Sequence, residues 1–255
     1  MSTRESKIVV AGATGVVGRH VVVQARAAGH RVVPLSRSSG QDVVTGAGLA
    51  EAVAGADVVI DVTSVVTTSA RTSVDFFRAG TQNLLAAGQS AGVGHHVALS
   101  IVGIDGGTTG YYAGKVVQEE LVAAGPVPWT VLRATQFHEF APQIAARASV
   151  GPLVAVPAMR TSTVAAAEVA AALVTLATAP PRGRTADLGG PGEDDLDELV
   201  RRWLAATGRR GRVLRLPMPG AAGRRMRTGA LLPGPGADRG RQTFDEWLAT
   251  GAPSR

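Results

Sequence analysis

Hydrophobic and polar positions follow two different periodicities along the first half of the chain. Short runs rich in β-branched residues predict buried strands, and longer stretches with apolar residues three and four positions apart predict helices. The predicted strands are Lys7–Ala11, Arg31–Leu35, Asp57–Val62, His95–Val102 and Trp129–Leu132. The predicted helices are Val16–Ala28, Gly48–Ala54, Val74–Ala91 and Tyr111–Ala124, with a glycine-rich loop over Asp105–Gly110. Strands that alternate with helices are typical of an α/β protein with a parallel sheet.

The second half of the chain has a less regular pattern. Helices are predicted over Val164–Ala177, Asp195–Ala206 and Ala221–Leu232, and strands over 185–188 and 213–216. A capping box, Thr243 with Glu246, predicts the start of a last short helix. We expect a first region over residues 1–135 and a smaller region over 136–255, with the strand at 185–188 returning to the sheet.

Three glycines, Gly12, Gly15 and Gly18, follow the first strand and open the first helix. The N-terminus of a helix carries unpaired N–H groups and partial positive charge, and both suit a pyrophosphate. The first glycine permits a tight turn, the second lets the backbone approach the phosphates, and the third lets the helix pack on the sheet. The alternative is a turn without a ligand. The residues expected to bind a dinucleotide here are Gly12, Thr14, Gly15, Val16, Val17 and Gly18.

The second strand ends in Ser36 and Arg37, with no acidic residue at that position. An acid there would bind the ribose 2′-hydroxyl of NAD, whereas an arginine accommodates the 2′-phosphate of NADP. The sequence therefore favours NADP, and the alternative is an ordinary surface arginine. Ligands of open α/β sheets bind outside the carboxyl ends of the strands. On that rule we expect Asp42 and Val43 at the adenine edge and Thr63 and Ser64 over the middle of the cofactor; Asn83 is a candidate for holding a neighbouring loop.

Both tyrosines and one of the two lysines lie within five residues, Tyr111 to Lys115. Tyr111 and Lys115 are four positions apart and share one face of a helix. An ammonium beside a phenol favours the phenolate and is expected to lower the phenol's pKa. Ser100 lies near the carboxyl end of the preceding strand, where catalytic groups are expected. Tyr112 is a rival for the same role, and a structural aromatic at the helix start is the alternative.

These motifs together resemble the atypical short-chain dehydrogenase/reductase superfamily, NmrA-like subgroup. The resemblance covers residues 7 to 140 and rests on the glycine loop, Gly80-Thr81-x-Asn83-Leu84-Leu85, Ser100, Tyr111-x-x-x-Lys115 and Arg133 to Phe137. It implies a Rossmann-type doubly wound parallel sheet that binds NADP and a small C-terminal substrate region. It also implies that Ser100 polarises a carbonyl, Tyr111 donates a proton, and Lys115 binds the ribose and activates the phenol. Further expected contacts are Ala134 and Thr135 with the cofactor, and Gln136, Phe137 and Phe140 with the substrate.

Composition narrows the remaining classes. The net charge of +6 invites a nucleic-acid partner, but no helix-turn-helix or zinc signature accompanies it, so none is expected. The absence of cysteine excludes disulfides and thiolate chemistry. His95 and His96 are expected to be surface or half-buried residues and not metal ligands, so no metal is expected. No apolar run approaches the length of a membrane span, and a cytoplasmic protein with no membrane partner is expected.

Two functions stay open at this point. The first is an NADPH-dependent oxidoreductase that reduces a carbonyl or enone of an apolar small molecule. The second is a non-catalytic NADP-binding sensor or regulator. The Tyr111–Lys115 pair favours the first, because a sensor has no use for an activated phenol. The sequence leaves the oligomeric state open.

Overall fold

The computed structural model describes residues 5–105 and 109–251, and its internal contacts divide the chain into two compact units. The first unit holds Met1–Arg133 and Ala167–Thr185, and the second holds Ala134–Ala166 and Ala186–Arg255. Residues 106–108 of the loop predicted over Asp105–Gly110 lie outside the described residues. The functional division into residues 1–135 and 136–255 stays a prediction.

The first unit is built on a parallel sheet. Its strands are β1 (Lys7–Ala11), β2 (Arg31–Leu35), β3 (Val58–Asp61), β4 (His95–Ile101), β5 (Trp129–Ala134) and β9 (Gly183–Arg184). Their order is β2-β1-β3-β4-β5-β9, and the pairs β1/β2, β1/β3, β3/β4 and β5/β9 are parallel. The chain winds in opposite directions from β1, which confirms the predicted doubly wound α/β fold. Ligands of such sheets bind at the carboxyl ends of the strands where the order reverses, here β1 and β3.

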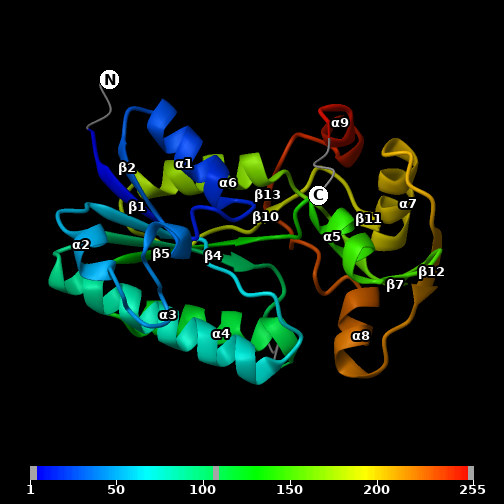
Figure 1. Ribbon diagram of the computed structural model, residues 1–255, viewed down its shortest axis with the longest axis horizontal. Coiled ribbons are helices and arrows are strands. Elements are labelled where there is room, and N and C mark those ends of the chain that lie inside the picture. The colour runs from blue at the N-terminus through cyan, green and yellow to red at the C-terminus, as the bar shows by residue number, and fades with distance from the viewer. Residues whose placement is uncertain (1–4, 106–108, 252–255) are drawn as a thin grey trace. The chain divides into compact units, whose positions relative to one another are not determined.

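Helices cover both faces of this sheet. They are α1 (Gly18–Ala27), α2 (Leu49–Val53), α3 (Ala70–Ser90), α4 (Gly110–Ala124) and α6 (Ala166–Ala177), with a short 3₁₀ helix η1 (Arg37–Ser39) after β2. Figure 1 shows α1 and α6 on one face and α3 and α4 on the other. The helix α3 begins four residues before its predicted start, because the hydroxyl of Ser69 accepts from the N–H of Thr72 and caps it.

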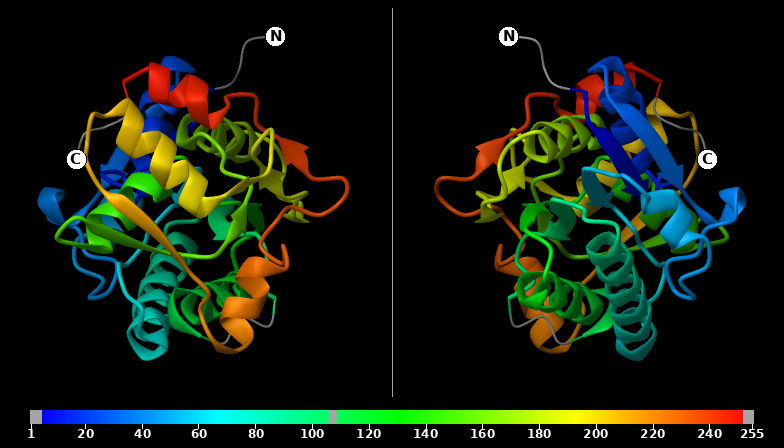
Figure 2. Two further views of the ribbon diagram at one scale, coloured as in Figure 1. Left: turned by 90° about the vertical axis from the view of Figure 1, so that its right-hand side faces the viewer. Right: turned by 90° about the vertical axis from the view of Figure 1, so that its left-hand side faces the viewer.

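Close packing of α3 on α4 depends on a glycine. A Cβ added to Gly114 would lie 2.3 Å from the hydroxyl oxygen of Ser73, so no side chain fits there. Figure 2 shows the two helices side by side in both views. This contact fixes the start of α4, the helix that carries Tyr111 and Lys115.

The paired histidines of β4 correct one expectation from the sequence. His95 and His96 are 4% and 1% exposed, so the prediction of surface or half-buried residues is wrong. A strand in the middle of a parallel sheet is covered by helices on both faces, and its polar residues are buried along with its apolar ones. His95 is accommodated because its Nε2 lies 2.8 Å from the hydroxyl of Thr130 on β5.

The second unit combines short strands with helices. Its strands are β6 (Ser149–Val150), β7 (Leu153–Pro157), β8 (Arg160–Thr161), β10 (Leu188–Gly189), β11 (Asp194–Asp195), β12 (Arg212–Leu216) and β13 (Asp238–Arg239). Its helices are α5 (Phe140–Arg147), α7 (Leu196–Ala206), α8 (Gly220–Arg227) and α9 (Phe244–Ala249). The capping box of Thr243 and Glu246 is confirmed.

Three features of this second half differ from the prediction. The helix α5 and the strands β6, β7, β8, β11 and β13 were not predicted. Four of these strands have only two residues, which carry no periodicity. The strand predicted over 185–188 is two pieces: β9 ends at Arg184, and β10 begins at Leu188, which pairs with Ala134. The helix α8 ends at Arg227 and not at Leu232, and the following Gly229 has a left-handed φ of 81°.

His138 lies at the centre of the aromatic packing in the second unit. It is fully buried, and its Nδ1 is 2.9 Å from the hydroxyl of Thr163 while its Nε2 donates to the carbonyl of Gln242 at 3.1 Å. A carbonyl can only accept, so the proton is on Nε2. The rings of Phe244 and Trp247 lie 5.6 and 5.7 Å from the imidazole. His138 therefore ties α9 to the segment before α5.

Candidate functional site

The glycine loop between β1 and α1 is tightly packed at two of its three glycines. Gly12 has a left-handed φ of 83°, and a Cβ there would lie 2.8 Å from the carbonyl oxygen of Val62. A Cβ on Gly18 would lie 2.1 Å from the carbonyl oxygen of Gly12. At Gly15, φ is not left-handed and the nearest heavy atom would be 3.2 Å away. The fold itself therefore needs the first and third glycines far more than it needs the second.

The N-terminus of α1 is open to an anion. Its N-cap residue, Val17, makes no side-chain cap, and the first turn contains no acidic residue. Thr14 and Gly15, just before it, are exposed. Helix-terminal N–H groups without a side-chain cap suit a phosphate, and the partial positive charge of the helix favours it. These residues fit the pyrophosphate of a dinucleotide.

Polar side chains gather where β2 ends. The hydroxyl of Ser36 lies 2.9 Å from those of Ser38 and Ser39, and this turn forms η1. Arg37 is exposed, and within the described ranges 5–105 and 109–251 it forms no ion pair. A guanidinium without a carboxylate partner beside several hydroxyl groups suits a phosphate.

Asn83 holds the turn that follows η1, as the sequence analysis expected. Its side-chain amide donates to the carbonyls of Val43 and Val44, both at 2.9 Å. The side chain of Val43 is buried, and Asp42 accepts from the N–H of Val44 at 2.8 Å. Both side chains therefore shape the turn itself, and their contact with an adenine stays a prediction.

Tyr111 begins α4 and reaches the segment after β3. Its hydroxyl lies 3.0 Å from that of Ser64, at hydrogen-bond distance. Burial raises the pKa of Tyr111 to about 12, and the negative charge of Asp61 adds to this effect. The expectation that Lys115 lowers the phenol's pKa is wrong. No hydrogen bond joins the two side chains within the described part of the chain.

The ammonium group of Lys115 is bonded to Leu99 and Gln118 and not to the phenol of Tyr111. The side chain is 3% exposed, and its Nζ donates to the carbonyl of Leu99 at 2.5 Å and to the side-chain oxygen of Gln118. Its Nζ also lies 4.7 Å from the centre of the Phe77 ring. Burial lowers the pKa of Lys115 to about 8, although the charges of Asp61 and Glu119 oppose the shift.

Among the described residues, neither Ser100 nor Thr63 forms a hydrogen bond with Tyr111. Ser100 is 3% exposed, and its hydroxyl has no hydrogen-bond partner among the residues that the structure describes. Thr63 donates its N–H and its hydroxyl to one oxygen of Asp61, at 2.9 and 2.7 Å. The structure thus joins Tyr111 to Ser64, and Lys115 to Gln118.

A buried arginine, for which the sequence predicted no contacts, anchors α4. Arg133, near the end of β5, donates to both oxygens of Glu119 at 2.8 and 2.7 Å and to both oxygens of Asp105 at 2.6 and 2.9 Å. Although burial opposes it, these hydrogen bonds raise the pKa of Arg133, and they lower the pKa of Asp105. The partners are far apart in sequence, so no local pattern reveals the cluster. It holds α4 and the segment before it to the sheet.

The remaining predicted residues lie in the second unit. Ala134 and Thr135 are buried, and the hydroxyl of Thr135 donates to the carbonyl of Ser162 at 2.5 Å. The side-chain oxygen of Gln136 accepts from the hydroxyl of Thr161 at 2.8 Å, and its buried Nε2 has no partner in the described part of the chain. The half-buried aromatic residues predicted to border the substrate are Phe137 and Phe140. Their roles toward a ligand stay predictions.

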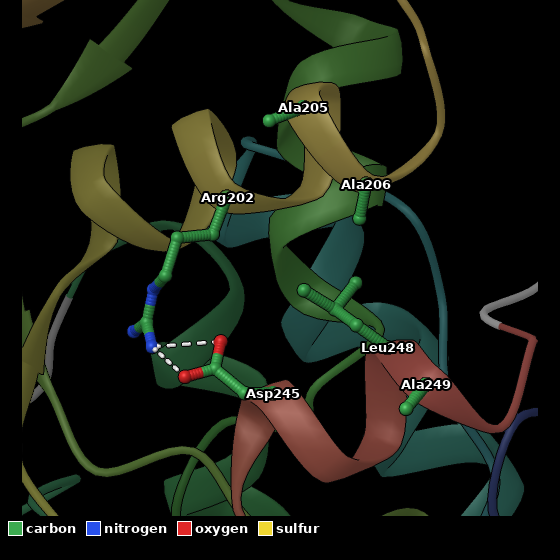
Figure 3. Close-up of a pocket in the computed structure, with 6 residues that line it drawn as sticks. All are labelled: Arg202, Ala205, Ala206, Asp245, Leu248 and Ala249. Atoms are coloured by element: carbon green, nitrogen blue, oxygen red, sulfur yellow. Dashed lines mark hydrogen bonds and ion pairs between the residues drawn. The ribbon is translucent and has the colours of Figure 1, made fainter.

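Two surface pockets in the second unit contain none of the predicted residues. One, of about 540 Å³, lies between α7 and α9, where Arg202 pairs with Asp245 at 3.0 Å (Figure 3). The other, of about 310 Å³, is lined by Arg160, Glu193, Asp194, Asp195, Arg215 and Arg227. Across residues 5–105 and 109–251, no cluster of His, Asp and Glu side chains is arranged to hold a metal ion. None of the helices in these ranges has the length and apolar character to cross a membrane.

Because the chain has only two lysines, the titration of Lys115 can be measured directly. We expect lysine-labelled protein to show one side-chain resonance, assigned by Lys7→Arg, that titrates near pH 8. Between this value and the ordinary 10.5, only the unfolded chain keeps the proton, so the free energy of unfolding rises with pH. In Lys115→Met this rise should shrink by on the order of 3 kcal/mol. Titration near 10.5 would contradict the burial of the ammonium.

Comparisons with known proteins agree with this geometry. A family model described as NAD(P)H-binding matches residues 12–180. No curated protein matches the chain significantly. An NADPH-dependent quinone oxidoreductase from Escherichia coli is 17% identical with a TM-score of 0.66, covering 95% of this chain and 98% of that one.

Two further solved structures share the fold. A short-chain dehydrogenase/reductase superfamily protein from Agrobacterium tumefaciens with bound NAD is 20% identical with a TM-score of 0.68, covering 96% of this chain and 95% of that one. A UDP-glucose-4-epimerase from Stenotrophomonas maltophila with bound NAD is 17% identical with a TM-score of 0.73, covering 96% of both chains. At these identities the likeness shows the fold, which is the Rossmann-type fold of short-chain dehydrogenases/reductases.

The family model assigns the chain to a family, whereas the similar solved structures show only its fold. It begins at the first glycine of the loop and covers well over half of the chain. The NmrA-like subgroup stays a prediction. The site described here, from the glycine loop to α4, lies within the matched segment, and the chain belongs to the NAD(P)H-binding family.

Proposed function

We propose that this protein is an NADPH-dependent oxidoreductase that reduces a carbonyl or enone of an apolar small molecule by hydride transfer. The observation that carries the proposal is the phenol of Tyr111, hydrogen-bonded to Ser64 just after the carboxyl end of β3. That strand end belongs to the switch point where an α/β sheet binds its ligand. A proton donor beside a nicotinamide site supports reduction of a carbonyl.

The chain's own residues would hold the cofactor in two places. The loop from Gly12 to Gly18 and the N-terminus of α1 would bind the pyrophosphate. Arg37, with the hydroxyls of η1, would bind the 2′-phosphate of NADPH. When bound, the cofactor supplies the hydride. One similar solved structure is named as NADPH-dependent and others contain NAD, so the preference for NADPH rests on Arg37.

Tyr111 would supply the proton that the substrate oxygen needs. With a pKa of about 12, the phenol keeps its proton at neutral pH and can donate it once negative charge develops on the oxygen. The hydroxyl of Ser64 orients the phenol through their hydrogen bond. Ser100, whose hydroxyl has no hydrogen-bond partner among the described residues, is proposed to stabilise the developing oxyanion with a second hydrogen bond.

Phe137, Phe140 and Gln136 are proposed to contact the substrate. Phe137 and Phe140 supply apolar surface, and the amide nitrogen of Gln136 is a donor without a partner in the described residues. Apolar walls with one or two polar groups are typical of small-molecule sites. A quinone or a ketone fits this chemistry, and the similar quinone oxidoreductase makes quinones a sensible first panel.

A second function, a non-catalytic NADP-binding sensor, is favoured by one specific observation. The ammonium of Lys115 is engaged with Leu99 and Gln118 and does not contact the phenol. A protein that only binds NADP needs neither an acidic phenol nor an ammonium beside it. Turnover by variants of Tyr111 distinguishes the two functions.

The cofactor preference depends on Arg37. We expect NADPH to bind more tightly than NADH, and Arg37→Ala to weaken NADPH binding by roughly 10- to 150-fold, since a charge-assisted hydrogen bond contributes about 1.5–3 kcal/mol. NADH affinity should hardly change. Arg31→Ala, at the other end of β2, is the matched control and should leave both affinities unchanged. Titration calorimetry of the wild type and the two variants with each cofactor measures these affinities, and equal affinity of the wild type for both cofactors would exclude this role.

Gly15→Val tests the phosphate site separately from the fold. A branched side chain at position 15 would occupy the space that the pyrophosphate needs, while its Cβ meets the protein only at 3.2 Å. We expect a folded protein that no longer enhances NADPH fluorescence. Gly18→Val is the contrasting variant and should unfold, because its Cβ would lie 2.1 Å from a backbone oxygen. Undiminished NADPH binding by folded Gly15→Val protein would refute the site.

Tyr111→Phe tests the proton donor. The change removes only the hydroxyl, so folding and NADPH affinity should persist while turnover falls by at least about 100-fold. Tyr112→Phe, the neighbouring change, should lose little activity. Steady-state NADPH oxidation with a panel of quinones and ketones measures both variants. If Tyr111→Phe turns over like the wild type, the reductase mechanism is wrong in this form.

A further inference from the structure

The buried carboxylate of Asp61 lies between the contacts of Tyr111 and those of Lys115. Asp61 is the last residue of β3 and is 1% exposed. One of its oxygens accepts from the N–H and the hydroxyl of Thr63, at 2.9 and 2.7 Å. The other accepts from the side-chain amide of Gln118 at 2.8 Å. A carboxylate buried to this extent is tolerated only when its oxygens are hydrogen-bonded, and both of them are.

Each oxygen of Asp61 is connected, through an intermediate residue, to one side chain on α4, either Tyr111 or Lys115. Thr63 immediately precedes Ser64, whose hydroxyl lies 3.0 Å from that of Tyr111. The amide oxygen of Gln118 accepts from the ammonium of Lys115. One oxygen of Asp61 therefore holds the segment that carries Ser64, the partner of the phenol. The other oxygen holds Gln118, the partner of the ammonium.

The titratable groups that interact with the charge of Asp61 come from two elements. They are Tyr111 and Lys115 on α4 and the buried His96 on β4. Burial lowers the pKa of His96, and the charge of Asp61 opposes this shift. The same charge raises the pKa of Tyr111 and opposes the lowering of the pKa of Lys115. Asp61 thus acts electrostatically on His96, Tyr111 and Lys115.

We propose that Asp61 is a positioning residue that sets the orientation of the Tyr111 hydroxyl and the placement of the Lys115 ammonium at the same time. The proposal rests on the proposed reductase function for its catalytic consequence. The hydrogen-bond arrangement itself does not depend on any activity. Gln118 is the connecting residue, because its amide donates to Asp61 and accepts from Lys115.

Asp61→Asn breaks this arrangement without changing its shape. The introduced amide can still accept from Thr63, but its NH₂ group then faces the NH₂ group of Gln118, and two donors cannot bond. If Gln118 turns its amide over, its NH₂ group faces the ammonium of Lys115 instead. One of the two links is lost in either case.

The double variant Asp61→Asn/Gln118→Glu restores every link. The introduced carboxylate accepts from the introduced amide with one oxygen and from Lys115 with the other. The amide oxygen at position 61 continues to accept from Thr63. This double change keeps the net charge of the wild type, so it separates a requirement for the arrangement from a requirement for a charge at position 61.

The first measurement is the titration of Lys115 by NMR of lysine-labelled protein. In Asp61→Asn we expect the pKa of Lys115 to fall below its wild-type value of about 8, and in the double variant to recover. Asp57→Asn is the matched control at the opposite end of β3, where the exposed carboxylate accepts from the N–H of Lys7 at 2.7 Å. It should leave the titration of Lys115 unchanged.

The second measurement is steady-state turnover. Asp61→Asn should lower kcat by about 10- to 100-fold, since a small misplacement of reacting groups costs up to about 10²-fold. KM for NADPH should stay close to the wild-type value, and the double variant should regain activity. If Asp61→Asn does not fold, Gln118→Met is used in its place. That change removes the hydrogen bonds of Gln118 to Lys115 and Asp61 and keeps those between Asp61 and Thr63.

The two measurements separate the proposals. If the wild type reduces no quinone or ketone, the reductase function fails, but the NMR titration still decides whether Asp61 places Lys115. An unchanged titration of Lys115 in folded Asp61→Asn, or in Gln118→Met, would overturn the positioning role. Active wild type with fully active Asp61→Asn would overturn its catalytic consequence.

Discussion

Backbone atoms between β1 and α1 approach so closely that two positions admit only glycine. The N–H groups of Gly12 and Ala13 both donate to the carbonyl of Leu35 at the end of β2, at 3.1 and 3.3 Å. The N–H of Val62, after β3, donates to the carbonyl of Ala11 at 3.0 Å. The ends of three neighbouring strands are thus bonded to one another through the loop. The N-terminus of α1 is therefore held at the switch point of the sheet before any ligand arrives, which reduces the entropy that binding would otherwise cost.

Polar contacts to two strands help to place α4, in addition to its close packing on α3. Two adjacent residues of this helix reach different strands: Gln118 bonds to Asp61 on β3, and Glu119 bonds to Arg133 on β5. The core is built mostly from Ala, Val and Leu, whose packing tolerates small shifts and rotations. Buried hydrogen bonds have strict distance and angle requirements, and losing one partner leaves the other buried and unpaired. They therefore fix the helix that carries Tyr111 and Lys115.

Sequence patterns predicted the features that depend on neighbouring residues. The strands and helices of the first unit, the tight turn at Gly12, the contact of Asn83 with its neighbouring turn and the capping box of Thr243 all follow from short-range chemistry. The contacts of Asp61 with Gln118 and of Arg133 with Glu119 and Asp105 were missed because these partners lie 14 to 57 residues apart. The pKa of Tyr111 was predicted in the wrong direction, because helical spacing places two side chains on one face but does not state how deeply either is buried. The same limit applied to His95 and His96.

Burial shifts the pKa values of Tyr111 and Lys115, both on α4, in opposite directions. It raises the pKa of the phenol and lowers that of the ammonium, because in each case the neutral form is favoured in a poorly solvated site. At neutral pH both Tyr111 and Lys115 consequently hold their protons, but with increasing pH the ammonium releases its proton first. The positive charge in this site is then lost while the phenol is still protonated. In the proposed mechanism the phenol keeps its proton and is oriented by Ser64, and no phenolate stabilised by lysine is needed. A lysine suits position 115 because its compact ammonium donates both to a backbone carbonyl and to a side-chain amide oxygen.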